Sequence, residues 1–308
     1  MTFSVVAMVK PSAAELYRFA NHYIDIGAER VYAFFDGGRA DLDAREIDAS
    51  MLPAGTEVIA LDDEFWNARG IQRPDEFIKR RREVHAYGKH LCTSKWLFIC
   101  DEDEFIIERH PIHEALATIP EHVISVRLPV AEAVWGPGDD LGEAFGSTWF
   151  RRPWPVALDR RRVRLLVYGP FGGFFSRGVL GHISGKQFVR TDAFIDELGT
   201  HVSSVNGENV SVWGDEISPE MGALELAHFD AISFDRWIRK FRARAHDPSI
   251  REITKKTRQR QTDLVNHLVG QRRWLAWRLF AHFYGLSTRQ ARFLERRGLA
   301  FREIVFKA

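Results

Sequence analysis

Short apolar runs alternate with longer amphipathic segments through the first hundred residues of the chain. Continuously apolar runs predict buried strands at 2–9, 31–35, 57–61 and 96–100. Apolar residues at helical spacing predict a helix over 13–26, which Ser12 caps and Gly27 ends. A second, basic helix is predicted over 74–92. Strands that alternate with helices in this way indicate an α/β fold with a mostly parallel sheet sandwiched by helices.

The rest of the chain is less regular until it turns helical near its end. Strands are predicted at 123–128, 163–167 and 188–189, and the stretch 135–155, rich in Gly, Trp and Pro, is interpreted as loops. From Phe234 onward, apolar residues at i, i+3, i+4 and i+7 predict an amphipathic helix with a basic outer face. A short and unusually apolar helix is predicted around 274–284.

Charge is distributed unevenly along the chain. The total of 43 Lys and Arg against 42 Asp and Glu is almost balanced. Residues 236–308, however, contain 19 basic and five acidic residues, a net charge of +14, which leaves −13 for residues 1–235. We therefore expect an acidic body over 1–235 and a basic helical C-terminal region over 236–308, and such a region indicates an anionic partner.

Several classes of protein are excluded by composition. A hydrophobic content of 45% with almost no net charge excludes a disordered chain. No apolar run approaches the roughly 18–20 residues of a membrane span, and the apolar stretch at 1–10 is too short for a signal peptide. The two cysteines, Cys92 and Cys100, give neither a disulfide framework nor a metal-binding spacing. We expect a cytoplasmic globular protein.

Polar groups follow three of the predicted strands: Lys10, Asp36 and the run 101–104. Ligands of parallel α/β sheets lie beyond the carboxyl ends of the strands, so these groups are expected to share one crevice. In an extended segment Asp101 and Asp103 would project to the same side, where they could hold Mg²⁺ or Mn²⁺ and its bound phosphates. A solvated acidic turn explains the same run without any ligand.

The stretch 96–106, WLFICDEDEFI, looks like the W-(apolar)-D-x-D-E-F-(apolar) signature of GT-A glycosyltransferases related to glycosyltransferase families 2 and 92. Further matches to these enzymes follow in order: Met8-Val9-Lys10, His22 with Gly27, the strand ending at Asp36, Gly185-Lys186 with Arg190, His201, Ala227-His228-Phe229, Ser233-Phe234 and Lys240. The resemblance covers roughly residues 5–242 and implies a GT-A (Rossmann-like) fold with a C-terminal helical appendage. The family's Asn and Glu after Val-Lys are Pro11 and Ser12 here, and a common glutamate of the first helix is Arg18.

The resemblance assigns roles to several of these residues. Asp103, helped by Asp101, and the late histidine His228 would bind Mn²⁺ or Mg²⁺. His228 is equally well explained as a packed core residue. Lys10 and Asp36 are candidates for the base and ribose of a nucleotide, although Lys10 can also be an exposed strand end.

Other polar residues are candidates for catalysis and for binding of the donor. Lys186 and Arg190 could bind donor phosphates, or they could be the polar ends of a strand. An inverting transfer needs a base near the acceptor hydroxyl, and the candidates are Asp215, Glu216, His201 and His182, which spacing does not separate. Three tryptophans in the predicted loops could stack on sugar rings or anchor the loops: Trp135, Trp149 and Trp154.

The basic C-terminal region has four interpretations. Its helices can pack their apolar stripe on the body, bind an anionic membrane face, recognise an acidic glycan or phosphate-rich acceptor, or bind nucleic acid. The run 272–280, RRWLAWRLF, joins arginines to tryptophans as membrane-surface helices do. Only charge supports nucleic acid, which makes it the weakest interpretation.

The resemblance therefore implies a metal-dependent, inverting glycosyltransferase that moves a sugar from a nucleotide-diphosphate sugar to a glycan or lipid-linked acceptor, at the inner membrane face or in the cytoplasm. The alternatives are a metal-dependent nucleotidyl or phosphoryl transferase and a non-catalytic relative that binds glycans or membranes.

Overall fold

The structure is a computed structural model that describes residues 1–246 and 256–306. Contacts divide the chain into two compact units: Met1–Pro129 with Ser184–Leu226 (unit 1), and Val130–Ile183 with Ala227–Ala308 (unit 2). These units are not the two regions expected from charge, which stay a prediction about domain organisation. Five charged residues of the basic region lie outside the described residues: Asp247, Arg251, Glu252, Lys255 and Lys307.

Unit 1 is built on a seven-stranded sheet with the order β13-β6-β9-β4-β1-β2-β3. Its strands are β1 (Phe3–Val9), β2 (Val31–Phe35), β3 (Thr56–Ala60), β4 (Trp96–Cys100), β6 (Ser125–Leu128), β9 (Lys186–Arg190) and β13 (Ser211–Trp213). All neighbours are parallel except β9, which runs antiparallel to both β4 and β6. The predicted mostly parallel sheet is confirmed, and each apolar run that predicted it forms a strand within two residues of the expected bounds.

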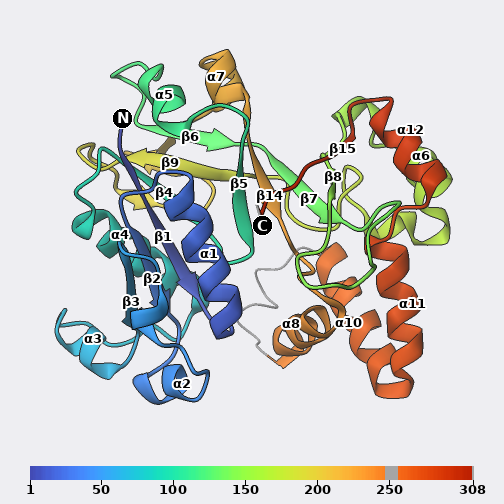
Figure 1. Ribbon diagram of the computed structural model, residues 1–308, viewed down its shortest axis with the longest axis horizontal. Coiled ribbons are helices and arrows are strands. Elements are labelled where there is room, and N and C mark those ends of the chain that lie inside the picture. Colours follow the sequence, from blue (N-terminus) through green and yellow to red (C-terminus); the bar gives the residue numbers. More distant parts are fainter. Residues whose placement is uncertain (247–255, 307–308) are drawn as a thin grey trace. The chain divides into compact units, whose positions relative to one another are not determined.

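Helices cover both faces of this sheet (Figure 1). On one face Val6 of β1 meets α4 (Phe77–Leu91), and on the other Phe98 of β4 packs against Tyr23 of α1 (Ala13–Asp25). Ser12 caps α1 as expected, since its side chain accepts the backbone N–H of Glu15 in a capping box. Burial on both faces explains why these strands are apolar at every position rather than at alternate ones.

The other elements of unit 1 are short. They are α2 (Arg39–Asp43), α3 (Asp63–Asn67), α5 (Ile112–Ala117), α7 (Pro219–Gly222), β5 (Glu104–Glu108), β10 (Glu197–Leu198), β11 (Ser203–Val205) and β12 (Glu208–Asn209). Strand β14 (Leu224–His228) pairs with β5 and continues into unit 2 at Ala227.

Unit 2 combines a small antiparallel sheet with five helices among the described residues. The strands are β7 (Val130–Val134), β8 (Trp149–Arg151) and β15 (Ala300–Arg302), and β8 lies between the other two. The helices are α6 (Arg161–Tyr168), α8 (Phe234–His246), α10 (Lys256–Gln271), α11 (Arg273–Tyr284) and α12 (Thr288–Glu295). The helices predicted from Phe234 and around 274–284 are therefore confirmed.

One prediction about the middle of the chain is wrong. The apolar run at 163–167 is helical, not a strand: Val163 and Val167 are partly buried against the core, whereas Leu165 and Leu166 are exposed. The run was too short to show this helical period.

Of the two interpretations of Trp135, Trp149 and Trp154, their burial favours anchors over platforms for sugars. Each is at most 6% exposed within the aromatic core of unit 2.

In the described part of the chain, no helix is both long enough and apolar enough to cross a bilayer.

Gly88 gives a test of how α4 packs on the sheet. A methyl group at this position would lie 2.5 Å from Cγ2 of Val6. Gly88→Ala should therefore destabilise the protein by about 1–3 kcal/mol, although alanine favours helices. The free energy of unfolding from urea denaturation measures this change. Gly270→Ala in α10 is the matched control, because nothing lies within 4 Å of the place its methyl group would take, and it should be neutral or stabilising. Equal effects of the two changes would contradict the packing.

Candidate active site

The acidic run 101–104 forms a tight turn between β4 and β5. The backbone N–H of Glu104 donates to the carbonyl of Asp101 at 3.1 Å, and the Glu104 carboxylate accepts the Asp101 N–H at 2.8 Å. The expected alternation of an extended segment is therefore wrong here. Because the chain turns, Asp101 and Glu104 share a partner, while Asp103 is a separate, buried carboxylate.

The shared partner is Lys186, a fully buried lysine at the start of β9. Its Nζ lies 2.6 Å from Oδ2 of Asp101 and 3.2 Å from Oε2 of Glu104. Arg81 of α4 adds a second cation at 2.5 Å from Oδ1 of Asp101. Burial would raise the pKa of Asp101, but Arg81 and Lys186, with His201 when protonated, hold that pKa well below its usual range. Asp101 is therefore a carboxylate at neutral pH.

A second carboxylate–arginine cluster follows β2. Oδ1 of Asp36 lies 2.7 Å from Nη2 of Arg73 and 3.4 Å from Nε of Arg80. Lys10, at the end of β1, has an exposed side chain, and its backbone N–H donates to the Glu102 carboxylate. Since β1, β2 and β4 are parallel, these residues all lie at the carboxyl edge of the sheet, as expected.

The arginines of this edge were not predicted from the sequence. Arg73, Arg80 and Arg81 lie in or just before α4, and each contacts one of the two aspartates. A signal for them exists, because the helix predicted over 74–92 is basic. Polar groups at strand ends stand out because they interrupt apolar runs, whereas a charged helix looks like an ordinary solvated surface.

His201 lies beside the acidic turn. Its Nδ1 is 2.7 Å from the carbonyl oxygen of Gly185, the residue before Lys186. A carbonyl only accepts, so the neutral ring carries its proton on Nδ1 and Nε2 is the basic nitrogen.

Two other groups of candidates lie farther away in unit 1. Asp215 and Glu216 are exposed after β13, three strands from β4, which is about 14 Å at normal strand spacing. Arg190 is at the opposite end of β9 from Lys186, about 13 Å along the strand. There Arg190 binds the carboxylate of Asp192, so the structure does not bring it to the acidic turn.

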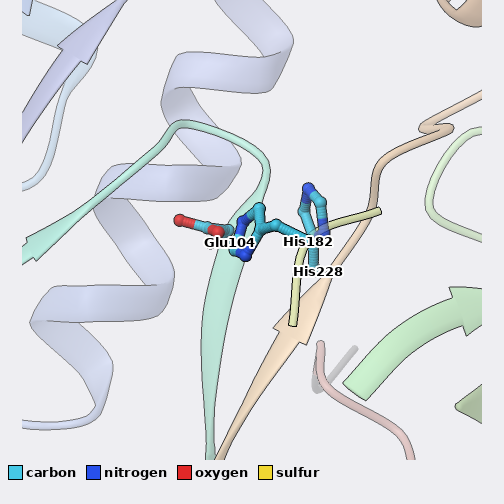
Figure 2. Close-up of side chains that lie close together, drawn as sticks. All are labelled: Glu104, His182 and His228. Atoms are coloured by element: carbon cyan, nitrogen blue, oxygen red, sulfur yellow. The ribbon is translucent and has the colours of Figure 1, made fainter. Parts of the chain in front are cut away.

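In unit 2 two histidines lie side by side (Figure 2). The ring centroids of His182 and His228 are 4.9 Å apart, and a ring nitrogen of each lies within 4.8 Å of the other's. The carboxylate of Glu132 accepts the backbone N–H groups of Leu180 and Gly181, which fixes the segment that carries His182.

Glu132 is itself held by Arg151. Both side chains are buried, and Nε of Arg151 donates to Oε2 of Glu132 at 2.6 Å. The chain packs closely on His228 at Gly181, because a methyl group there would lie 3.2 Å from the His228 ring and from Oε1 of Glu132. Imidazole nitrogens bind divalent transition-metal ions, so the two neighbouring histidines are compatible with the metal that the sequence predicts.

Comparison of the sequence with protein-family models and with curated proteins gives no match. Among solved structures, the chain is similar to glucosyl-3-phosphoglycerate synthase from Mycobacterium tuberculosis in complex with Mn²⁺, UDP-glucose and glycerol 3-phosphate (15% identity, TM-score 0.31, 62% of this chain and 57% of that chain). It is also similar to HddC from Yersinia pseudotuberculosis (10% identity, TM-score 0.35, 69% of this chain and 89% of that chain). The chain thus spans less than two thirds of the synthase. Similarity of this degree establishes no shared function, so the function has to be argued from the residues themselves.

Replacement of Asp101 tests the ion cluster. Because its folded-state pKa lies below the unfolded value of about 4, the carboxylate stabilises the fold above that pH, and the stabilisation is lost as pH falls through the folded-state pKa. Asp101→Asn should lower the free energy of unfolding by about 1–3 kcal/mol at pH 7, and the difference from wild type should shrink below pH 4. Urea denaturation at several pH values measures it.

The exposed Asp43→Asn is the control for this measurement and should change stability by less than about 0.5 kcal/mol at every pH. A difference between Asp101→Asn and wild type that stays constant from pH 7 to pH 3 would contradict the assigned pairing.

Proposed function

We propose that the protein is a metal-dependent GT-A-like glycosyltransferase that uses a nucleotide-diphosphate sugar. The observation that carries the proposal is the acidic D-E-D-E turn at the carboxyl edge of a mostly parallel sheet, surrounded by Lys186 and the α4 arginines. The carboxylates of the turn can bind a cation, and the basic side chains beside them can bind phosphates. A diphosphate that is bridged by a metal ion requires both kinds of group. The sequence resemblance to families 2 and 92 supports the same class.

In this proposal the diphosphate of the donor replaces the aspartates as the partner of the arginines. Arg73 and Arg80 are bound to Asp36, and Arg81 is bound to Asp101. Guanidinium groups bind phosphate as well as carboxylate, so they can turn to the donor while the aspartates are freed for the ribose or the cation. In this proposal Lys10 and Asp36 contact the nucleoside, and Lys186 keeps the acidic turn in place.

The family resemblance implies Asp103, helped by Asp101, and His228 as ligands of the cation. Mn²⁺ or Mg²⁺ in such a site stabilises the negative charge of the departing diphosphate. His182 is added to the predicted set because of its position beside His228.

His201 is the base that we propose for an inverting transfer. Nε2 is its basic nitrogen. The other ring nitrogen, Nδ1, hydrogen-bonds to the carbonyl of Gly185, the residue before Lys186. Asp215 and Glu216 stay alternatives that an acceptor extending along the sheet edge would reach. We propose a glycan or a lipid-linked acceptor, in keeping with the family resemblance.

Thermal unfolding with nucleotides tests the donor assignment. UDP or GDP at about 100 times its Kd, with Mn²⁺, should stabilise the native state by about 2.7 kcal/mol. Asp103→Ala should abolish the Mn²⁺-dependent part of the shift and the turnover of a nucleotide sugar. Glu208→Ala, an exposed carboxylate on β12, should change neither.

Two results of this screen would overturn the proposal. Preference for nucleoside triphosphates, with release of pyrophosphate, would indicate a nucleotidyl transferase. No stabilisation by any nucleoside diphosphate would indicate a non-catalytic binding protein.

The two histidines can be tested by Mn²⁺ titration. His228→Ala and His182→Ala should each weaken Mn²⁺ binding at least about tenfold in the presence of UDP, read from the electron paramagnetic resonance signal of free Mn²⁺. His267→Ala, on the exposed face of α10, is the control and should bind as wild type does. Wild-type affinity in both site variants would remove the histidines from the metal site.

A further inference from the structure

The segment 156–166 of unit 2 exposes four large apolar side chains. Val156 and Leu166 are 78% and 86% exposed, and Leu158 and Leu165 are 40% and 38% exposed. Val156 and Leu158 belong to a short 3₁₀ turn, and the two adjacent leucines belong to α6. These side chains lie within eleven residues of each other along the chain, so this one short segment exposes several large apolar groups.

Leu165 and Leu166 do not belong to the side of α6 that packs on the core. The opposite side of α6 does so, where Val163 and Val167 pack against the core and Tyr168 is buried. A helix that has already buried one apolar side and still presents Leu165 and Leu166 has a second apolar side with no described partner.

Arginines surround the exposed leucines. The segment contains Arg160, Arg161, Arg162 and Arg164 against a single acidic residue, Asp159, which Arg164 binds. The first three are exposed, and two of them lie in the turn of α6 just before the leucines.

We propose that segment 156–166 binds the surface of an anionic lipid membrane. Leucine and valine side chains would enter the acyl boundary while the arginines contact lipid phosphates, which is how surface-lying amphipathic helices bind. A free phosphate would use the arginines and leave the leucines in water. The lipid surface is therefore the ligand that accounts for both halves of the patch.

Contacts at its C-terminal end hold α6 in place. The Tyr168 hydroxyl donates to the carbonyl of Gly178 at 2.7 Å, its ring stacks on Phe175 at 3.8 Å, and Gln290 of α12 donates to the Val167 carbonyl at 2.7 Å. The patch can therefore bind without refolding, which lowers the entropic cost of binding.

Two tryptophans of the basic C-terminal helices are also exposed. Trp277 packs edge-on against Phe234 and stacks with Phe280, and it is 38% exposed. Trp274, at 50%, is exposed less than Val156 or Leu166. The two most exposed apolar side chains of unit 2 outside the C-terminal region therefore belong to segment 156–166, and the proposal holds whether or not the protein is a glycosyltransferase.

Vesicle flotation with the full chain tests the proposal. The wild type should float with phosphatidylcholine vesicles that contain phosphatidylglycerol and should not float with pure phosphatidylcholine. Leu165→Gln with Leu166→Gln should lower the partition coefficient at least about tenfold. Arg161→Gln with Arg162→Gln should lower it about fivefold per arginine, and added salt should weaken wild-type binding.

Matched controls separate the patch from general effects. Phe194→Gln removes an exposed apolar residue of unit 1, and Arg289→Gln with Arg296→Gln removes one exposed arginine in α12 and one directly after it. Both should float as wild type does, and all variants should keep their thermal stability. Equal binding to neutral vesicles, or unchanged binding of the leucine variant, would overturn the proposal. Self-association without vesicles that only the leucine variant loses would assign the patch to a second copy of the chain instead.

Discussion

The arrangement of the candidate site depends on one buried ammonium group. Lys186 is fully buried between the carboxylates of Asp101 and Glu104, and these two charges offset the cost of burying its ammonium group. It connects the antiparallel strand β9 to the turn that leaves β4. Without it, the four consecutive carboxylates at the edge of an apolar sheet would repel one another and tend to protonate.

In unit 2, too, buried carboxylates paired with basic side chains lie close to the two histidines. The buried pair of Glu132 and Arg151 orients the segment of His182. Two residues after His228, Asp230 is buried with Lys240 at 3.0 Å and accepts the Tyr284 hydroxyl at 2.6 Å, and Arg258 also contacts it. Although burial opposes it, Arg258 and Lys240 keep the pKa of Asp230 well below the usual range. In both units a buried carboxylate with fixed charge therefore positions residues that we assign to chemistry.

The sequence predicts the sheet of unit 1 well because strands buried on both faces are apolar without interruption, as in 96–100. It predicts the acidic turn less well, since D-E-D-E gives no signal for the hydrogen bond from Glu104 to Asp101 that breaks the alternation. A single sequence also gives no signal for ion pairs between residues far apart along the chain. Neither Arg81 nor Lys186 can be recognised from the sequence as a partner of Asp101. For Trp154 the sequence leaves exposure and burial open, because long-range packing decides the burial of this residue.

The near balance of charge over the whole chain conceals how the two basic regions of unit 2 differ. Along the C-terminal helices most of the apolar stripe is packed: Trp237, Phe241 and Phe280 are buried in the aromatic core, and only Trp274 and Trp277 of α11 are exposed among the large apolar side chains that the structure describes in these helices. Segment 156–166 keeps both kinds of group at its surface. Charge alone attracts any polyanion at a distance and is screened by salt, whereas charge next to exposed leucines selects a surface that also has an apolar interior. The C-terminal helices are thus suited to attraction of an anionic partner, and α6 is suited to contact with one.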